Sequence, residues 1–90
     1  MLEVRAGVDA LDLEVIRLLG KRFRYMEAAA RIKPARNDVR DEVRKREVIA
    51  NVRKAADCEG VPPVLAENLY EVLVEASIAY EFDRFDERTG

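Results

Sequence analysis

Residues 2–33 read LEVRAGVDALDLEVIRLLGKRFRYMEAAARIK. This stretch decides the fold, because its apolar side chains recur at spacings of three and four, the period of a helix that buries one face. Pro34 follows at once, and proline disfavours helix in the residue before it, so we expect the helix to end near Lys33. The apolar stripe consists of Val4, Val8, Leu11, Val15, Leu18, Met26 and Ala29.

The remaining prolines divide the rest of the chain into two more helices. Gly60 is a natural helix C-cap just before a Pro-Pro pair, so a second helix is expected over about residues 39–57. A third helix is expected over about residues 63–87, with proline in its first turn and a broad apolar surface. The predicted fold class is all-α, with a single domain over residues 1–90.

The first helix is too long for a domain of this size. At 1.5 Å per residue it measures about 45 Å, whereas a compact chain of this length has a radius of gyration of about 12 Å and a diameter of about 30 Å. An apolar stripe that overhangs its own domain needs another chain to cover it. We therefore expect a three-helix protomer in an intertwined helical homodimer.

Composition excludes several kinds of chemistry. The 90 residues include no His and one Cys, Cys58. Such a chain cannot build the common zinc sites, a Ser-His-Asp relay or an internal disulfide, so no metal and no cofactor are expected. No apolar run reaches the length of a membrane span and no signal-peptide pattern is present, so we expect a soluble, cytoplasmic protein without a membrane partner.

Charge is unevenly distributed along the chain. The first 58 residues hold 14 basic and 10 acidic side chains, and the remaining 32 hold two and eight. The basic run at residues 40–46 alternates with Asp and Glu in an acidic domain, which argues against nucleic acid as a partner. The distribution fits either a small anion bound beside an acidic helix or helices that complement each other.

Two cations interrupt the apolar stripe of the first helix. Arg22 and Lys33 are 11 residues apart and therefore face within about 20° of the same direction. They either extend outward to solvent or to acids of the third helix, or they form an anion pocket inside the bundle. Arg5 lies about 25 Å from Arg22 along the axis, so it could contribute only from a second subunit.

The third helix carries polar side chains on an apolar stripe of its own. Ser77 and Glu81 are four residues apart and share this stripe with Leu73 and Phe85. A carboxylate is unexpected there. Either the stripe is partly exposed, or Glu81 is an ion-pair partner of Lys33 or Arg22, or Glu81 is a functional hydrogen-bonding group.

The motifs that carry a resemblance are Arg5, VDALD at 8–12, LLGKR at 18–22, AARIK at 29–33, VRD at 39–41 and Arg44. Together they resemble the all-α chorismate mutase family and its close relatives, the isochorismate-pyruvate lyases. The resemblance covers nearly the whole chain. It implies a three-helix protomer in an intertwined dimer with two equivalent sites. The dimer agrees with the expectation drawn above from the length of the first helix.

The resemblance also implies roles for single residues. Arg22 is similar to the arginine that holds a substrate carboxylate, joined by Arg5 of the partner subunit. Lys33 is similar to the lysine that donates to the ether oxygen of the breaking C–O bond. Asp41 is similar to a residue near the substrate hydroxyl, and Ser77 to one near the ring carboxylate.

Two positions depart from the family pattern. Glu81 stands where many members carry Gln, the second donor to the ether oxygen. A carboxyl group donates only when protonated, so we expect activity to fall as pH rises. Lys45 stands where mutases commonly carry a Glu that binds the substrate hydroxyl.

The implied function is that of a chorismate mutase, with Lys33 and Glu81 as catalytic residues. The rearrangement of chorismate, a dicarboxylate, to prephenate belongs to aromatic amino-acid biosynthesis in the shikimate pathway. This pericyclic step needs no nucleophile, metal or cofactor, only a restrained conformer and stabilised charge. One alternative is an isochorismate-pyruvate lyase that yields salicylate and pyruvate. Another is a catalytically weak helical dimer that binds or regulates a partner enzyme.

Overall fold

The computed structural model describes residues 1–89, which form three long helices and one short 3₁₀ turn. The elements are α1 (Leu2–Ile32), η1 (Arg36–Asp38), α2 (Glu42–Glu59) and α3 (Pro63–Thr89). No strand occurs in this part of the chain, so the all-α, three-helix prediction is confirmed. Over the same residues, no helix combines the length and apolarity that crossing a bilayer requires.

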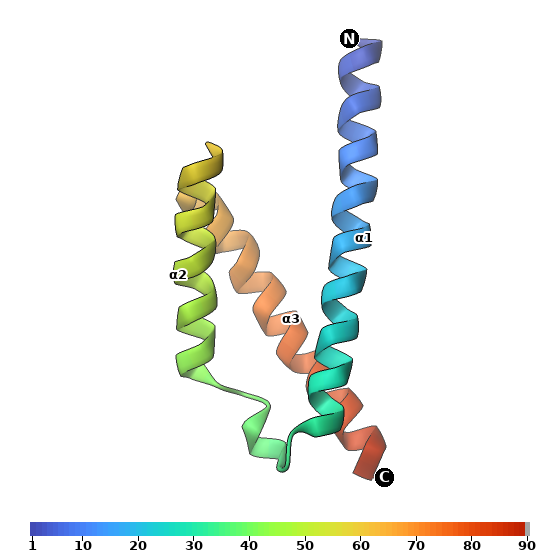
Figure 1. Cartoon of the computed structure of the whole chain (residues 1–90), viewed down its shortest axis with the longest axis vertical. Helices are drawn as coiled ribbons and strands as arrows, with labels where there is room; N and C mark the ends of the chain where they lie inside the picture. Colours follow the sequence, from blue (N-terminus) through green and yellow to red (C-terminus); the bar gives the residue numbers. More distant parts are fainter. Residues whose placement is uncertain (90) are drawn as a thin grey trace.

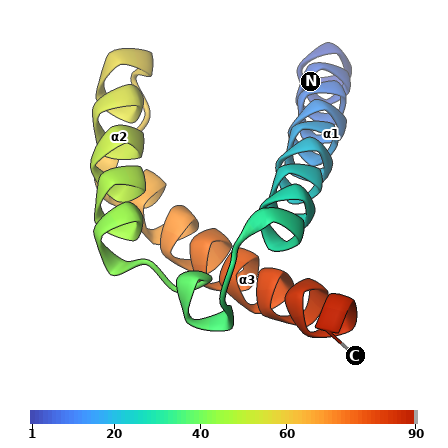
Figure 2. The same ribbon diagram turned by 60° about the horizontal axis from the view of Figure 1, so that its bottom comes forward.

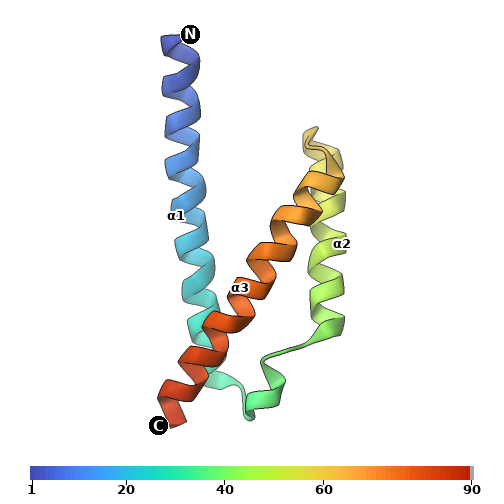
Figure 3. The same ribbon diagram turned by 180° about the vertical axis from the view of Figure 1, so that it is seen from behind.

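Helix α3 is the element on which the other two helices rest. It runs diagonally from the end of α2 to the end of α1 (Figures 1 and 3). Within residues 1–89, α1 and α2 each pack against α3 and not against each other. Figure 2 shows α1 and α2 rising apart from α3. The broad apolar surface predicted for the third helix is explained by these two neighbours.

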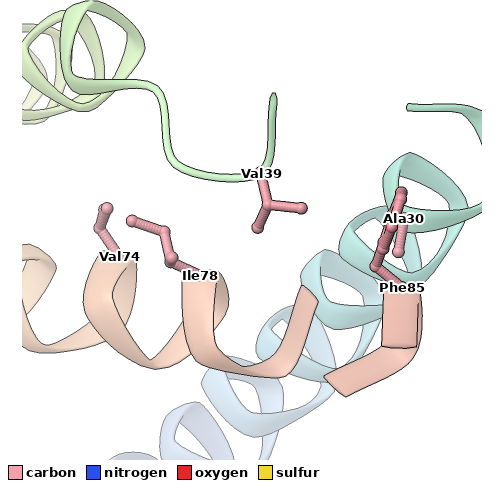
Figure 4. Packing of buried hydrophobic residues seen from close by; sticks show 5 residues of the cluster. All are labelled: Ala30, Val39, Val74, Ile78 and Phe85. Carbon is pink, nitrogen blue, oxygen red and sulfur yellow. The ribbon is translucent and has the colours of Figure 1, made fainter. Parts of the chain in front are cut away.

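The core is small and lies where α1, α3 and the linker between α1 and α2 meet. Figure 4 shows the Val39 side chain reaching down from the linker toward α3, while Ala30 of α1 lies beside Phe85 of α3. This core fixes the C-terminal half of α1 and the linker relative to α3. Its buried apolar members are Ala30, Val39, Val74, Ile78 and Phe85.

The N-terminal half of α1 lies outside this core. Residues 1–18 are all exposed, and Figure 1 shows the N-terminal end of α1 projecting beyond the other helices. The longest dimension is 51 Å and the radius of gyration is 15.7 Å, against about 12 Å for a compact chain of this length. The predicted overhang is confirmed, and Leu11 of the apolar stripe is 65% exposed.

Three helix boundaries follow their predicted signals. α1 ends at Ile32, within one residue of the prediction, because Pro34 cannot continue the helix. Gly60 caps α2 with a φ of 74°, a left-handed conformation that glycine adopts without strain. Pro63 opens α3, as predicted.

The predicted start of the second helix near residue 39 is wrong. α2 begins at Glu42, because the Asp41 carboxylate accepts a hydrogen bond from the Arg44 backbone N–H at 3.0 Å and caps the helix. Residues 36–38 form η1 instead. The linker therefore turns back toward α3 before α2 starts, which is how Val39 reaches the core.

Candidate active site

A cavity of about 350 Å³ opens between α1, the first turns of α2 and α3. Its apolar wall includes Met26 and Ala29 from α1, Val48 from α2 and Ile78 from α3. The structure brings five of the six predicted site residues to this one cavity. They are Arg22, Lys33, Asp41, Ser77 and Glu81.

Arg22 presents a half-buried guanidinium to the cavity. Its Nη1 donates to Ser77 Oγ at 2.6 Å, and Ser77 Oγ donates to the Leu73 carbonyl at 2.6 Å. The guanidinium carbon lies 5.8 Å from the centre of the Tyr70 ring. Among residues 1–89, no carboxylate forms an ion pair with Arg22. An arginine oriented in this way keeps N–H donors for an external anion, which it binds best as a planar carboxylate.

Lys33 and Glu81 meet at the cavity wall from α1 and α3. The Lys33 ammonium forms an ion pair with Glu81 Oε1. The Glu81 side chain is 5% exposed, and its Oε1 has no partner in hydrogen-bond geometry. Glu81 is therefore an ion-pair partner of a cation on the first helix, namely Lys33, which was one of the alternatives predicted from the sequence. The two groups that the resemblance assigns to the ether oxygen are in contact with each other.

The start of α2 and the linker before it contribute the predicted Asp41 and two side chains that the sequence reasoning missed, Arg44 and Asp38. Asp41 both caps α2 and lines the cavity. Arg44 and Asp38 line it as well, and Arg44 Nη1 donates to Glu47 at 3.3 Å. A signal for Arg44 existed, because a residue three positions after a helix cap faces the same side as the cap. Asp38 carried no such signal, since its place depends on η1.

Lys45 lines the cavity, but its ammonium forms ion pairs with carboxylates outside the cavity. The ammonium lies 3.0 Å from carboxylate oxygens of Glu71 and Glu75, two α3 residues that are not part of the cavity wall. These carboxylates raise the pKa of Lys45, Glu71 first. Arg40 also binds Glu75, at 2.7 and 3.1 Å. Its hydrogen bonds, followed by that of Lys45, lower the pKa of Glu75 to about 2.

Arg5 does not line the cavity. It lies on the exposed N-terminal half of α1, about 25 Å along the helix from Arg22. The structure thus agrees with the sequence expectation that one chain cannot bring both arginines to the same small ligand. The cavity of a single chain holds one unpaired guanidinium, contributed by Arg22.

The set of groups defines what the cavity can do. Its four cations and three acids surround an apolar wall, which suits a small anionic ligand with a carbon skeleton. The cations Lys33, Arg44 and Lys45 are already paired with carboxylates, so Arg22 is the one ready for a ligand anion. Such groups can bind, orient and stabilise developing charge.

Comparison with known proteins identifies the family. The chain matches the family described as chorismate mutase type II over residues 4–82. It is also similar to an isochorismate pyruvate lyase of Pseudomonas aeruginosa, with 23% identity over 88 residues that cover 98% of this chain and 87% of that protein. The resemblance found in the sequence motifs is confirmed. The chain belongs to the chorismate mutase type II family, whose enzymes act on chorismate-like substrates.

Proposed function

We propose that this protein is a chorismate mutase that rearranges chorismate to prephenate. The observation that carries the proposal is the half-buried Arg22, which has no carboxylate partner and faces the same cavity as Lys33 and Glu81. Chorismate has two carboxylates and one ether bond to break, so it requires a cation for binding and a donor at the ether oxygen. The apolar wall accepts the ring.

In the proposed mechanism, Arg22 binds one substrate carboxylate and holds the reactive conformer. The Lys33 ammonium donates to the ether oxygen, where negative charge develops as the C–O bond breaks. Ser77 accepts from Arg22 and holds this guanidinium in place near the ring carboxylate, while Asp41 accepts from the substrate hydroxyl. The bonds rearrange within the substrate, so the protein supplies orientation and charge stabilisation.

Glu81 gives the proposed reaction its pH dependence. To be the second donor to the ether oxygen, its carboxyl group must carry a proton, as other buried acids do in oxyanion sites. In the proposed active form the Glu81 carboxyl carries a proton, so the ion pair of the free protein gives way to two donors at the ether oxygen. Because a carboxyl group donates only while it holds its proton, we expect the rate to fall as pH rises.

We also propose that the working protein is a homodimer in which Arg5 of the partner subunit completes each cavity. The uncovered apolar stripe on α1 supports this proposal, since Leu11, Val15 and Leu18 are each at least half exposed in one chain. Two such helices lying against each other would bury both stripes. That arrangement would bring a second arginine to the substrate carboxylate.

The alternative reaction is the loss of pyruvate from isochorismate to give salicylate. Similarity to the Pseudomonas aeruginosa lyase favours it. Lys45 favours it too, because this residue replaces the Glu expected to bind the hydroxyl of chorismate. Against it, the Lys45 ammonium is held by Glu71 and Glu75, so the substituted residue does not present a free cation to the substrate.

A paired assay tests the proposal. Purified protein receives chorismate or isochorismate at mildly acidic and at neutral pH, and prephenate, pyruvate and salicylate are followed, with Lys33→Ala as the inactive control. Prephenate from chorismate supports the mutase. Pyruvate and salicylate from isochorismate, with little prephenate, assign the lyase instead. If neither substrate reacts, a dicarboxylate that raises the Tm would indicate that the protein still binds such a ligand without catalysing its reaction.

A further inference from the structure

The C-terminal end of α1 has carbonyl groups that its own backbone cannot satisfy. In a continuous helix the Ala30 carbonyl would accept from the N–H of residue 34, but residue 34 is proline and has none. The next N–H, that of Ala35, donates to Asp38 Oδ2 at 3.0 Å and is lost to the Arg31 carbonyl. Since Ala30 is 1% exposed, water does not readily supply the donor that its carbonyl lacks.

Arg88 of α3 supplies the missing donors. Its Nη1 donates to the Ala30 carbonyl at 2.9 Å and to the Arg31 carbonyl at 2.7 Å. Its Nη2 donates to the Lys33 carbonyl at 2.6 Å. The guanidinium also stacks over the ring of Phe85, with 4.0 Å between its carbon and the ring centre. One side chain therefore holds the last turn of α1 and the backbone of Lys33.

Arg88 and Glu81 connect α3 to the same short segment. They are seven residues apart, which places them on one face of the helix. Glu81 holds the ammonium end of Lys33, and Arg88 holds its carbonyl. The backbone of Lys33 is no longer helical, because its ψ is 133°. Without Arg88, no other described side chain is seen to donate to these three carbonyls.

We propose that Arg88 is a positioning residue for Lys33. By donating to the three carbonyls at the end of α1, it fixes the backbone from which the Lys33 ammonium reaches the substrate. The proposal rests on the proposed function of Lys33 and concerns a residue beyond the family match, which ends at residue 82. Displacement of a donor by about 1 Å can cost about 100-fold in rate, so a loosened segment would lower kcat.

The test compares Arg88→Gln with Arg36→Gln. Arg36 is a matched control, since it is a guanidinium near the same end of α3 that binds Asp86 at 2.9 and 3.3 Å and stacks over Phe82. It donates to none of the three carbonyls and does not line the cavity. Arg88→Gln should lower kcat about tenfold or more with KM within about twofold, whereas Arg36→Gln should change neither by more than about twofold. Equal losses of kcat in both variants would overturn the proposal.

A double-mutant cycle separates positioning from general damage. If Arg88 acts through Lys33, Arg88→Gln should have no further effect on kcat in a Lys33→Ala background. If the two losses multiply, Arg88 is merely structural and the proposal is wrong. Should Arg88→Gln fail to fold, Arg88→Lys serves in its place, because it keeps the charge but cannot reach three carbonyls with a planar fork.

A last readout does not depend on the reaction. The NMR signals of the Lys33 side chain report its contact with Glu81, and Glu81→Gln gives their reference without the ion pair. In Arg88→Gln these signals should move toward that reference, and in Arg36→Gln they should stay in place. Unmoved signals in Arg88→Gln would overturn the positioning role. A lack of product from wild-type protein, with the signals moving as expected, would contradict the proposed function alone.

Discussion

The two halves of α1 have the same helical period and meet different surroundings. The C-terminal half packs on α3 and contributes Arg22, Met26 and Lys33 to the cavity. The N-terminal half continues the apolar stripe through Leu11 and Val15, yet residues 1–18 are all exposed. α3 crosses α1 diagonally and leaves that half uncovered (Figure 3). The comparison shows that a stripe on a helix predicts burial, while the path of its neighbours decides what covers it.

The two halves of α1 also carry different site residues. One half holds Arg22 and Lys33, which line the cavity, and the other holds Arg5, which lies outside it. If the exposed half pairs with a second copy, its stripe becomes buried and Arg5 moves close to another cavity. Substitutions in one half of α1, or in its partners on α3, therefore test the two halves separately.

The largest effect is expected from a charge on the exposed half. Val15→Glu would put a carboxylate into the proposed dimer interface, where desolvation costs several kcal/mol, so the dimer should weaken about 1000-fold or more. Leu13→Glu is the control, because Leu13 is also exposed but faces away from the stripe. Sedimentation equilibrium measures the association. A variant Val15→Glu that remains dimeric would show that the stripe is not the interface.

The next effect lies in the packed half. Lys33→Ala removes the donor to the ether oxygen, and loss of one such donor typically costs about 100- to 1000-fold in rate. Lys21→Ala is the control, since Lys21 is an exposed cation of the same helix outside this cavity. Initial rates of prephenate formation measure both. A change below about tenfold in Lys33→Ala would remove Lys33 from the catalytic role.

A smaller effect is expected at the α3 partner of the packed half. Glu81→Gln has an N–H donor at any pH, whereas a carboxyl group donates only when protonated, so the variant should be faster than the wild type and its advantage should grow as pH rises. Its rate should not fall as pH rises, while that of the wild type should. A pH–rate profile from mildly acidic to mildly basic conditions measures this. Parallel profiles for the two proteins would contradict the proposed proton on Glu81.

The smallest effect concerns the ion-pair cluster that joins α2 to α3. The pKa of Glu75 falls from about 4.5 to about 2 through Arg40 and Lys45, so its ionised form stabilises the folded chain. This contribution is complete above the unfolded pKa near 4.5 and is lost as pH falls toward about 2. Because the groups are exposed, salt screens them and the change in Tm should be a few degrees at most. Glu75→Gln should therefore lower Tm at pH 7, and the Tm of the variant should decline less steeply than that of the wild type below pH 4.5. If the Tm of both proteins declines equally, Glu75 is not the source of the decline.

Much of the fold was predictable because its signals are local. Pro34 and Gly60 act through their own backbones, and the period of residues 2–33 is visible without knowledge of any neighbour. The start of α2 was not predictable in the same way. Asp41 caps the helix in competition with an uninterrupted helical pattern from Val39, and the burial of Val39 against α3 favours the cap.

The candidate site shows the same division. Helical spacing placed Arg22 and Lys33 on one face, and the structure brings them to one cavity. The sequence alone did not predict which partner each of these side chains has. Lys33 pairs with Glu81, while Arg22 donates to Ser77 and not to an acid. The role of Arg88 depends on a proline 54 residues earlier in the chain. Such contacts arise only when α3 is packed against the end of α1.

Subunit complementation tests most directly whether two chains build each site. Chains carrying Arg5→Gln or Arg22→Gln are assayed separately and after being unfolded and refolded together. Each variant alone should be nearly inactive. In the mixture about half of the dimers are mixed and hold one intact site of two, so about one quarter of the wild-type activity should return. A mixture no more active than its separate components, or full activity of Arg5→Gln alone, would contradict a site completed by Arg5 of the partner subunit.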